Sequence, residues 1–322
     1  MEARRVCVTG AGGYIASWLV KLLLSEGYKV NGTVRDPSSD EKNGHLKKLD
    51  KASENLQLYK ADVLQYDDLL SAIQGCEGVF HVASPVPEFN RVLINPEAEV
   101  IAPALTGTIN VLKACSEAGI KRVIVVSSFV TVFMNSKWPK DKVMDDSCWS
   151  EQELMRKIEH WYGLSKTIAE RAAWEHAEKT GLNLITVCPS MVYGPQLQTT
   201  VNASSLMLLT IVKGASEPMK NKLWFFVDVR DVADALLLVY EAAEASGRYI
   251  CAAHSTYLND LISQLKSIYP NYKYQQNFTE LQPECRVSSE KLKKLGWKTR
   301  AFEETLIDSI EFYQQAGLLE KN

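Results

Sequence analysis

The stretch Val6-Cys7-Val8-Thr9-Gly10-Ala11-Gly12-Gly13-Tyr14-Ile15-Ala16 runs from a short apolar segment into a cluster of glycines and then into an amphipathic segment. This order predicts a strand, a tight turn and a helix. Backbone N–H groups and the positive end of the helix would then surround a site for a phosphate. Gly10 would permit the turn, Gly13 would allow a pyrophosphate to approach, and Ala16 would let the helix pack on the strand. Because glycine can also serve turn geometry alone, this motif by itself leaves dinucleotide binding open.

The composition is that of a folded chain with no strong electrostatic preference for a partner. Among 322 residues, 46% are hydrophobic and 23% are charged, and the formal net charge is -3. This gives no reason to expect nucleic acid or an anionic membrane as a partner. The seven cysteines are scattered singly without a CxxC pair, so we expect neither a disulfide framework nor a metal site. We recognise no signal peptide or membrane span, and expect a cytoplasmic monomer or weak dimer that acts on a small molecule.

Strand and helix patterns alternate through most of the chain. After the opening strand, strands are predicted at residues 28–34, 56–61, 78–83, 122–127 and 184–187, with helical stretches such as 67–73, 97–118 and 161–179 between them. This predicts an α/β fold with a doubly wound parallel sheet that binds its ligand at the carboxyl ends of the strands. The pattern loosens after Gly194. We therefore expect a dinucleotide-binding domain at residues 1–194 that carries the catalytic residues, and a smaller, mainly substrate-binding lobe at residues 195–322, some of whose segments return to the first domain.

Charged residues follow the second and third predicted strands, where an adenosine would be bound. Arg35 ends the second strand, and Lys42 follows in a predicted loop at residues 38–43. Two cations favour the 2′-phosphate of NADP(H), although both could instead be solvated loop charges. Asp36 leaves open a contact with a free ribose hydroxyl. Asp62 could accept a hydrogen bond from an adenine amino group or cap the following turn.

The segment Tyr162-Gly163-Leu164-Ser165-Lys166 carries the strongest chemical signal. A tyrosine and a lysine at i and i+4 share one face of a helix. A nearby ammonium favours the phenolate and would lower the pKa of Tyr162 from its usual value of about 10. Val125-Val126-Ser127-Ser128 ends the fifth predicted strand and supplies a hydroxyl that could stabilise a developing oxyanion. This combination predicts acid–base chemistry on a carbonyl group.

The glycine turn, Arg35, Ser128 and Tyr162-x-x-x-Lys166 together resemble the extended short-chain dehydrogenases/reductases. Within that family, the stretches at residues 8–20, 78–85 and 188–195 resemble a plant branch. This branch holds cinnamoyl-CoA reductases, dihydroflavonol reductases, phenylacetaldehyde reductases and short-chain cinnamyl alcohol dehydrogenases. The resemblance covers nearly the whole chain and implies a Rossmann-type fold with NADP(H) as cofactor.

The same resemblance implies a role for each matched residue. Tyr162 would donate a proton to the carbonyl oxygen, Lys166 would tune its pKa, and Ser128, with Ser127 as the alternative, would bind the developing alkoxide. The residues expected to bind the cofactor are Gly10, Gly13, Tyr14, Ile15, Arg35, Lys42, Asp62, Val63, Val82, Ala83, Ser84, Ser127, Pro189 and Val192. The residues expected to face an aromatic substrate are Pro85, Phe129, Thr131, Met191 and Phe226. His81 and His160 are expected to be structural.

The sequence departs from cinnamoyl-CoA reductases around the catalytic tyrosine. Those enzymes typically carry Lys-Asn-Trp-Tyr-Cys-Tyr-Gly-Lys, whereas this chain has Glu159-His160-Trp161-Tyr162-Gly163-Leu164-Ser165-Lys166. We therefore expect reversible, NADPH-dependent reduction of hydroxycinnamaldehydes to the alcohols, as in cinnamyl alcohol dehydrogenases. The first alternative is reduction of hydroxycinnamoyl-CoA to the aldehyde. Dihydroflavonol or phenylacetaldehyde reduction follows, and a non-catalytic dinucleotide-binding protein is the remote alternative.

Overall fold

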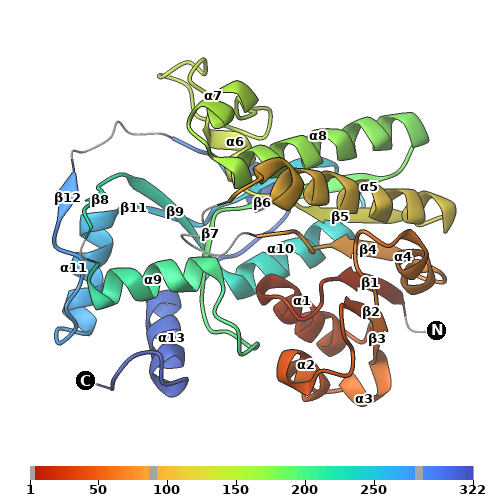
Figure 1. The fold of residues 1–322 in the computed structure, drawn as a ribbon, viewed down its shortest axis with the longest axis horizontal. Helices are drawn as coiled ribbons and strands as arrows, with labels where there is room; N and C mark the ends of the chain where they lie inside the picture. Colours follow the sequence, from red (N-terminus) through yellow and green to blue (C-terminus); the bar gives the residue numbers. More distant parts are fainter. Residues whose placement is uncertain (1–3, 87–92, 216, 280–285, 322) are drawn as a thin grey trace.

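A seven-stranded parallel sheet forms the centre of the protein (Figure 1), seen in a computed structural model that describes residues 4–86, 93–215, 217–279 and 286–321. Its strand order is β10-β6-β5-β4-β1-β2-β3. The strands are β1 (Arg5–Thr9), β2 (Lys29–Val34), β3 (Leu56–Lys60), β4 (Gly78–His81), β5 (Arg122–Val126), β6 (Leu184–Pro189) and β10 (Gly247–Cys251). Every neighbouring pair in this sheet is parallel. The predicted doubly wound α/β fold is confirmed.

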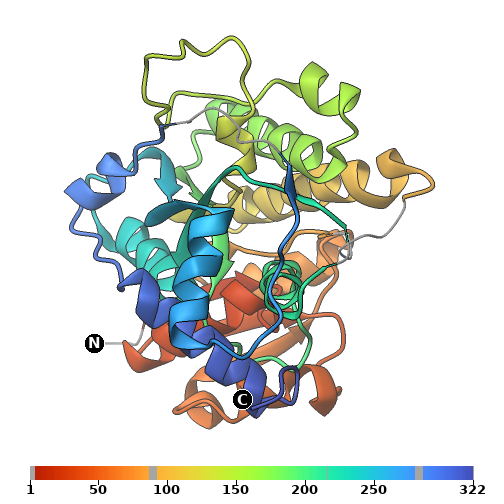
Figure 2. The same ribbon diagram turned by 90° about the vertical axis from the view of Figure 1, so that its left-hand side faces the viewer.

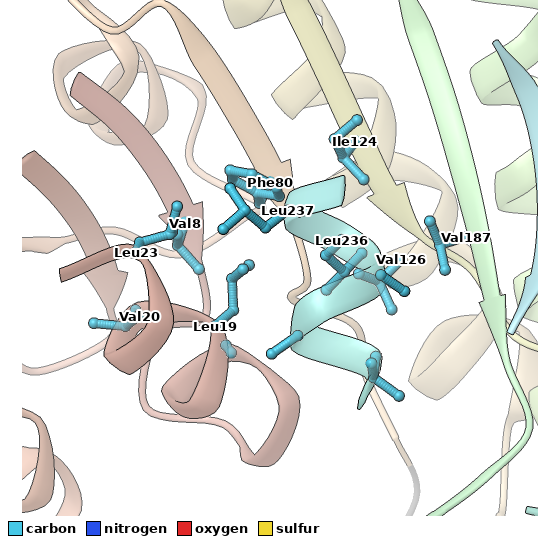
Figure 3. Close-up of a cluster of buried hydrophobic side chains, with 14 of the residues drawn as sticks. Val8, Leu19, Val20, Leu23, Phe80, Ile124, Val126, Val187, Leu236 and Leu237 are labelled. Atoms are coloured by element: carbon cyan, nitrogen blue, oxygen red, sulfur yellow. The ribbon is translucent and has the colours of Figure 1, made fainter. Parts of the chain in front are cut away.

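Helices cover both faces of this sheet because successive side chains of a strand point to opposite faces. On one face, Val6 and Val8 of β1 pack with α1 (Tyr14–Ser25) and α10 (Val229–Glu241). Figure 3 shows this cluster, in which Leu19 and Leu236 lie between the two helices and the strands. On the other face, Cys7 packs with α4 (Tyr66–Ile73), α5 (Ala102–Glu117) and α8 (Trp161–Thr180). Burying one large aliphatic side chain contributes about 1.5–3 kcal/mol, so each of these two layers stabilises the fold substantially.

The order of the strands places the ligand-binding edge. The chain runs outward from β1 to β2 and β3, and then crosses back to β4 on the other side of β1. Strand order therefore reverses between β1 and β4. In open α/β sheets ligands bind outside the carboxyl ends of the strands at such a point.

A second layer of structure follows β6. It contains a three-stranded sheet of β7 (Met191–Tyr193), β9 (Leu223–Asp228) and β11 (His254–Tyr257), and the short pair β8 (Met219–Lys220) and β12 (Phe278–Thr279). The helices α9 (Ala203–Lys213), α11 (Leu258–Ile268) and α13 (Phe302–Gln315) pack on it through a separate hydrophobic cluster. These elements lie together at one end of the molecule in Figure 1, and Figure 2 shows the blue helices α11 and α13 from that side. Meanwhile α10 and β10, from the same part of the chain, join the main sheet and its helical layer.

Several elements differ from the sequence prediction. The predicted loop at residues 38–43 is wrong, because α2 (Asp40–Lys47) begins within it. The Ser39 hydroxyl caps this helix by accepting a hydrogen bond from Lys42 N, and the first turn also contains two acidic residues, which favour a helix N-terminus. The predicted helix at residues 97–118 begins with a π-helical turn (Glu97–Ile101) before α5. Strands β10 and β11 were not predicted. The remaining short helices are α3 (Ala52–Asn55), α6 (Val130–Phe133), α7 (Gln152–Lys157) and α12 (Glu290–Lys294).

Within the described ranges, none of the helices combines the length and the apolar character needed to span a bilayer.

Candidate active site

The glycine turn lies at the carboxyl end of β1, next to the end of the neighbouring strand β4. Gly10 has a φ of 64°, in the left-handed region, and a Cβ at this position would stand 3.0 Å from the Cβ of Ala83. The Thr9 hydroxyl accepts hydrogen bonds from Val82 N and Ala83 N, each at 3.1 Å. Gly13 precedes α1 and has no side chain to cap its first turn. The strand ends are thus locked together, and the N-terminal N–H groups of α1 face the same region.

The two residues after Gly13 serve the packing of α1. Tyr14 is buried, and its hydroxyl donates to the carbonyl of Gly194 at 2.9 Å. Ile15 packs against the hydrophobic cluster of α1 and α10. Their side chains therefore fix the helix at the turn, and a role toward a phosphate would rest on their backbone N–H groups.

The adenosine side of the site carries two exposed cations. Arg35 follows β2 and Lys42 lies in the first turn of α2, both exposed to solvent. Asp36 accepts hydrogen bonds from the hydroxyl of Ser38 at 2.6 Å and from its N–H at 3.0 Å. These bonds, with a smaller contribution from Lys42, lower the pKa of Asp36. The Asp36 carboxylate therefore caps its own turn.

Asp62 and Val63 follow β3 on the same edge. One carboxylate oxygen of Asp62 accepts from Leu64 N at 2.9 Å, which is the turn-capping alternative raised by the sequence. Val63 packs so closely on α5 that a Cβ at Gly107 would lie 2.7 Å from its methyl group. A contact between Asp62 and an adenine remains a proposal.

Tyr162 and Ser128 meet where α8 begins and β5 ends. The ring Nδ1 of His160 accepts from Gly163 N at 3.0 Å and caps α8, so His160 is structural as expected. Burial raises the pKa of Tyr162, and a hydrogen bond with the Ser128 side chain opposes this effect. The phenol is therefore protonated at neutral pH and poised as a donor.

Lys166 lies one helical turn beyond Tyr162, almost completely buried. Its ammonium donates to the carbonyl of Val126 at 2.8 Å. Burial lowers the pKa of Lys166 from 10.5 to about 8. The lowering contribution at Tyr162 comes from Ser128 rather than from Lys166, which differs from the sequence expectation. The reason is geometric: the ammonium is bonded to the end of β5.

The choice between Ser127 and Ser128 is decided by what each hydroxyl contacts. Ser127 is buried, and its hydroxyl donates to the carboxylate of Glu170 at 2.6 Å. Ser128 is half-buried beside Tyr162. Adjacent residues leaving a strand point to opposite sides, and of these two hydroxyls it is that of Ser128 that lies beside Tyr162. Any contact of Ser127 with the cofactor is left to its backbone.

His81 is held inside the sheet rather than in the site. Its Nδ1 bonds the Thr9 hydroxyl at 2.9 Å and its Nε2 bonds the Thr108 hydroxyl at 3.3 Å. Burial, with a contribution from Lys166, lowers the pKa of His81 to about 3. A neutral imidazole with a hydrogen bond at each ring nitrogen has a structural role, as the sequence analysis expected.

The residues after β6 complete the edge near Ser128. The carbonyl of Pro189 accepts from Phe129 N at 2.8 Å, so the segment after β5 runs along the end of β6. Val192 is buried and Met191 is half-buried in β7. Ser84 and Pro85 are half-buried after β4, next to residues 87–92, which lie outside the described part of the chain.

Two expected substrate contacts are packed inside the protein. Thr131 has 0% exposure, donates to the carbonyl of Ser128 at 2.8 Å and accepts from Arg248 at 3.1 Å. Phe226 has 1% exposure and stacks on Tyr193. We therefore remove both from the proposed substrate-facing set.

Phe225 is an aromatic neighbour of Phe129 that the sequence analysis did not assign to the substrate. It is half-buried in β9, and its ring lies 4.9 Å from that of Phe129, which in turn stacks on Phe133 at 5.0 Å. The alternation of a strand indicates only that Phe225 and Phe226 point to opposite faces.

Comparison with known proteins agrees with this geometry. A family model described as the NAD dependent epimerase/dehydratase family matches residues 6–252. Cinnamoyl-CoA reductase 1 of Petunia hybrida is 43% identical over 318 residues, which cover 98% of this chain and 93% of the relative. Vestitone reductase from alfalfa is similar in structure, with a TM-score of 0.84 and 30% identity over 98% of this chain and 99% of that one. The yeast methylglyoxal/isovaleraldehyde reductase Gre2, crystallised with NADPH, has a TM-score of 0.84 and 26% identity, covering 98% of this chain and 100% of that one. The chain therefore belongs to the NAD dependent epimerase/dehydratase family of extended short-chain dehydrogenases/reductases, and resembles its plant reductase branch.

Proposed function

We propose that this protein is an NADPH-dependent reductase of a phenylpropanoid carbonyl group, with Tyr162 as the proton donor. The observation that carries the proposal is the meeting of Ser128, Tyr162 and Lys166 at the carboxyl end of β5, on the sheet edge that holds the glycine turn. A dinucleotide-binding protein without catalysis would need none of these three side chains.

The residues present fit NADP(H). The turn packs so closely on Ala83 that it requires glycine at position 10, and the first turn of α1 offers N–H groups for the pyrophosphate. Arg35 and Lys42 are exposed on the adenosine side, and we assign them to the 2′-phosphate, because Asp36 is engaged by its own turn. The similar yeast reductase was crystallised with NADPH, which supports NADP(H) as the cofactor. The other residues that we propose to line the cofactor are Asp62, Val63, Val82, Ala83, Ser84, Pro189 and Val192.

Bound NADPH would supply a hydride to the carbonyl carbon. The chain's own residues then manage the charge that appears on the carbonyl oxygen. Tyr162, protonated because burial raises its pKa, gives its proton to that oxygen. Ser128 offers a second hydrogen bond to the same atom. We assign the buried ammonium of Lys166, one helical turn from Tyr162, to the ribose hydroxyls of the cofactor, where it would help to place the nicotinamide beside Tyr162.

The comparisons favour a thioester as the carbonyl substrate. The cinnamoyl-CoA reductase of Petunia hybrida matches this chain over nearly its full length. This supports the alternative of the sequence analysis, reduction of hydroxycinnamoyl-CoA, more than the expected reduction of a free aldehyde. In that reaction the hydride and the proton from Tyr162 give a hemithioacetal, which loses the thiol CoA-SH as its C–S bond breaks and leaves the aldehyde.

One feature of the structure keeps the free aldehyde as a second candidate. Gly163 occupies the position at which cinnamoyl-CoA reductases typically carry cysteine. A Cβ here would lie 2.6 Å from Nδ1 of His160 and 2.9 Å from Val130. A side chain at this position would therefore disturb the His160 helix cap, immediately beside Tyr162.

The test is to measure NADPH oxidation with feruloyl-CoA and with coniferaldehyde under the same conditions. The main proposal expects kcat/KM for the thioester to exceed that for the aldehyde. A higher value for the aldehyde would establish the second candidate. If neither compound were reduced faster by the wild type than by Tyr162→Phe, the proposed function would be wrong.

A further inference from the structure

A buried carboxylate lies directly behind the catalytic lysine. Glu170 follows Lys166 by one turn of α8 and has 1% exposure. Its two oxygens accept hydrogen bonds from Ser127 Oγ at 2.6 Å, Thr186 Oγ1 at 2.8 Å and Arg248 Nε at 2.7 Å. The donors come from the end of β5, from β6 and from β10. The carboxylate thus joins the catalytic helix to three strands of the sheet.

Arg248 neutralises this carboxylate from the far side. It has 7% exposure and donates to the carbonyls of Asp146 at 2.9 Å and Cys148 at 2.7 Å, and to the hydroxyl of Thr131 at 3.1 Å. Its guanidinium also lies over the ring of Trp149, 3.7 Å from the centroid. Burying two charges is costly unless both are bonded from several sides, as they are here.

The charged groups around Lys166 show that Glu170 acts on its protonation. Burial lowers the pKa of Lys166, and Glu170 is the first of the two groups that raise it again, with Cys188 the other. Burial raises the pKa of Cys188 to about 12, so this thiol is neutral at pH 7. His81 on β4 is neutral as well, and Arg248 on β10 stands behind Glu170. Glu170 is therefore the negative charge in this group.

Glu170 stays ionised in this setting. Burial alone would raise the pKa of Glu170, but the charge of Arg248 and the donated hydrogen bonds outweigh burial and lower it. The same hydrogen bond from Ser127 fixes the strand end that carries Ser128. The Glu170 carboxylate thus acts on the charge of Lys166 and, through Ser127, on the position of Ser128.

We propose that Glu170, paired with Arg248, is a positioning residue that keeps the Lys166 ammonium charged and holds the strand end bearing Ser128 in register with Tyr162. This inference rests on the proposed function, which assigns Lys166 and Ser128 to the reaction. It adds a residue that touches neither substrate nor cofactor and acts through two residues that do.

The test compares the pH dependence of kcat in wild type and Glu170→Gln. The wild-type rate is expected to fall above pH 8, as Lys166 loses its proton. Removing a buried opposite charge nearby shifts a pKa by roughly one unit or more. The alkaline limb of the profile, the range in which kcat falls as pH rises, should therefore lie about one pH unit lower in Glu170→Gln. This shift lowers kcat about fivefold at pH 8 and about twofold at pH 7. Glu170→Asp keeps the charge and should restore most of the limb, while Glu178→Gln, exposed on the same helix, should leave it unchanged.

A second readout does not depend on turnover. The unfolding temperature of Glu170→Gln should lie below that of wild type, and this deficit should shrink as pH rises from 7 to 9. The reason is that Lys166, which lacks a counter-ion in the variant, loses its proton at a lower pH there than in wild type. If Glu170→Gln does not fold, E170Q/R248Q removes both charges without leaving either unpaired, and a smaller downward shift of the limb is expected, because loss of the Arg248 charge opposes loss of the Glu170 charge.

The outcomes separate the two proposals. Wild-type protein that reduces neither test carbonyl contradicts the proposed function, and the unfolding readout still tests the charge on Lys166. Wild-type turnover with an unmoved alkaline limb in a folded Glu170→Gln or E170Q/R248Q protein overturns the positioning role, even if kcat or stability falls. A lowered limb that Glu170→Asp restores supports it.

Discussion

Replacing Lys166 with methionine should remove a pH dependence of stability that this one buried ammonium creates. Lys166 has 8% exposure, and burial lowers its pKa from 10.5 to about 8. Between these values the unfolded chain binds a proton that the folded protein has released, so the contribution of Lys166 makes stability rise with pH. At about 1.4 kcal/mol per pKa unit the whole effect is about 3 kcal/mol, of which about 2 kcal/mol falls between pH 7 and pH 9.5.

The assay must isolate this contribution from groups that act in the opposite direction. Burial raises the pKa of Cys7, Cys115 and Cys188, so ionisation of these thiols in the unfolded chain reduces stability above about pH 8.5. Their effect cancels in the difference between the unfolding free energies of wild type and Lys166→Met, measured by urea denaturation at each pH. We expect this difference, wild type minus variant, to increase by about 2 kcal/mol from pH 7 to pH 9.5. Lys179→Met, an exposed position on the same helix, serves as the control and should give a constant difference. A constant difference for Lys166→Met as well would refute the reasoning.

Three further substitutions test the cofactor and proton-donor assignments. Tyr162→Phe should lower kcat by roughly 10²–10⁴-fold while NADPH binding, followed by fluorescence, is kept, since only proton donation is lost; weakened NADPH binding would contradict this. The double variant Arg35→Ala/Lys42→Ala should reduce the ratio of kcat/KM for NADPH over NADH by roughly 10–100-fold, because charged hydrogen bonds of about 1.5–3 kcal/mol are lost; an unchanged ratio would place the 2′-phosphate elsewhere. Gly10→Ala should destabilise the fold by about 1–3 kcal/mol, measured by chemical denaturation, because φ is 64° and the new Cβ stands 3.0 Å from that of Ala83; wild-type stability would show that the turn can relax.

Local signals in the sequence were sufficient for the framework of the site. The opening strand, the glycine turn and α1 are contiguous, and Tyr162 and Lys166 lie four residues apart on one helix. In both cases the geometry follows from neighbouring residues and from helical or strand periodicity. Long, strongly patterned elements such as α5 and α8 were placed for the same reason.

Choices between adjacent residues could not be made from the sequence. Ser127 and Ser128 are both hydroxyls at the end of β5, and Phe225 and Phe226 are both aromatic residues in β9. A strand turns each neighbour to the opposite side, so the decision depends on register, and register is fixed by distant partners. Here the partners are Glu170 for Ser127 and Phe129 for Phe225.

The pair of Lys166 and Glu170 shows why the interior of the site was not apparent from the sequence. A lysine followed by a glutamate four residues later is the usual pattern of a solvated ion pair on the surface of a helix. In α8, however, the two residues continue the buried face that includes Ala173 and Ala177. The burial of Glu170 depends on its counter-ion, Arg248. This residue lies 78 residues beyond Glu170 in the chain, in a strand that the sequence analysis did not predict. A charge can be assigned to the interior only when its partner is known, and that partner was brought to Glu170 by the return of β10 to the main sheet.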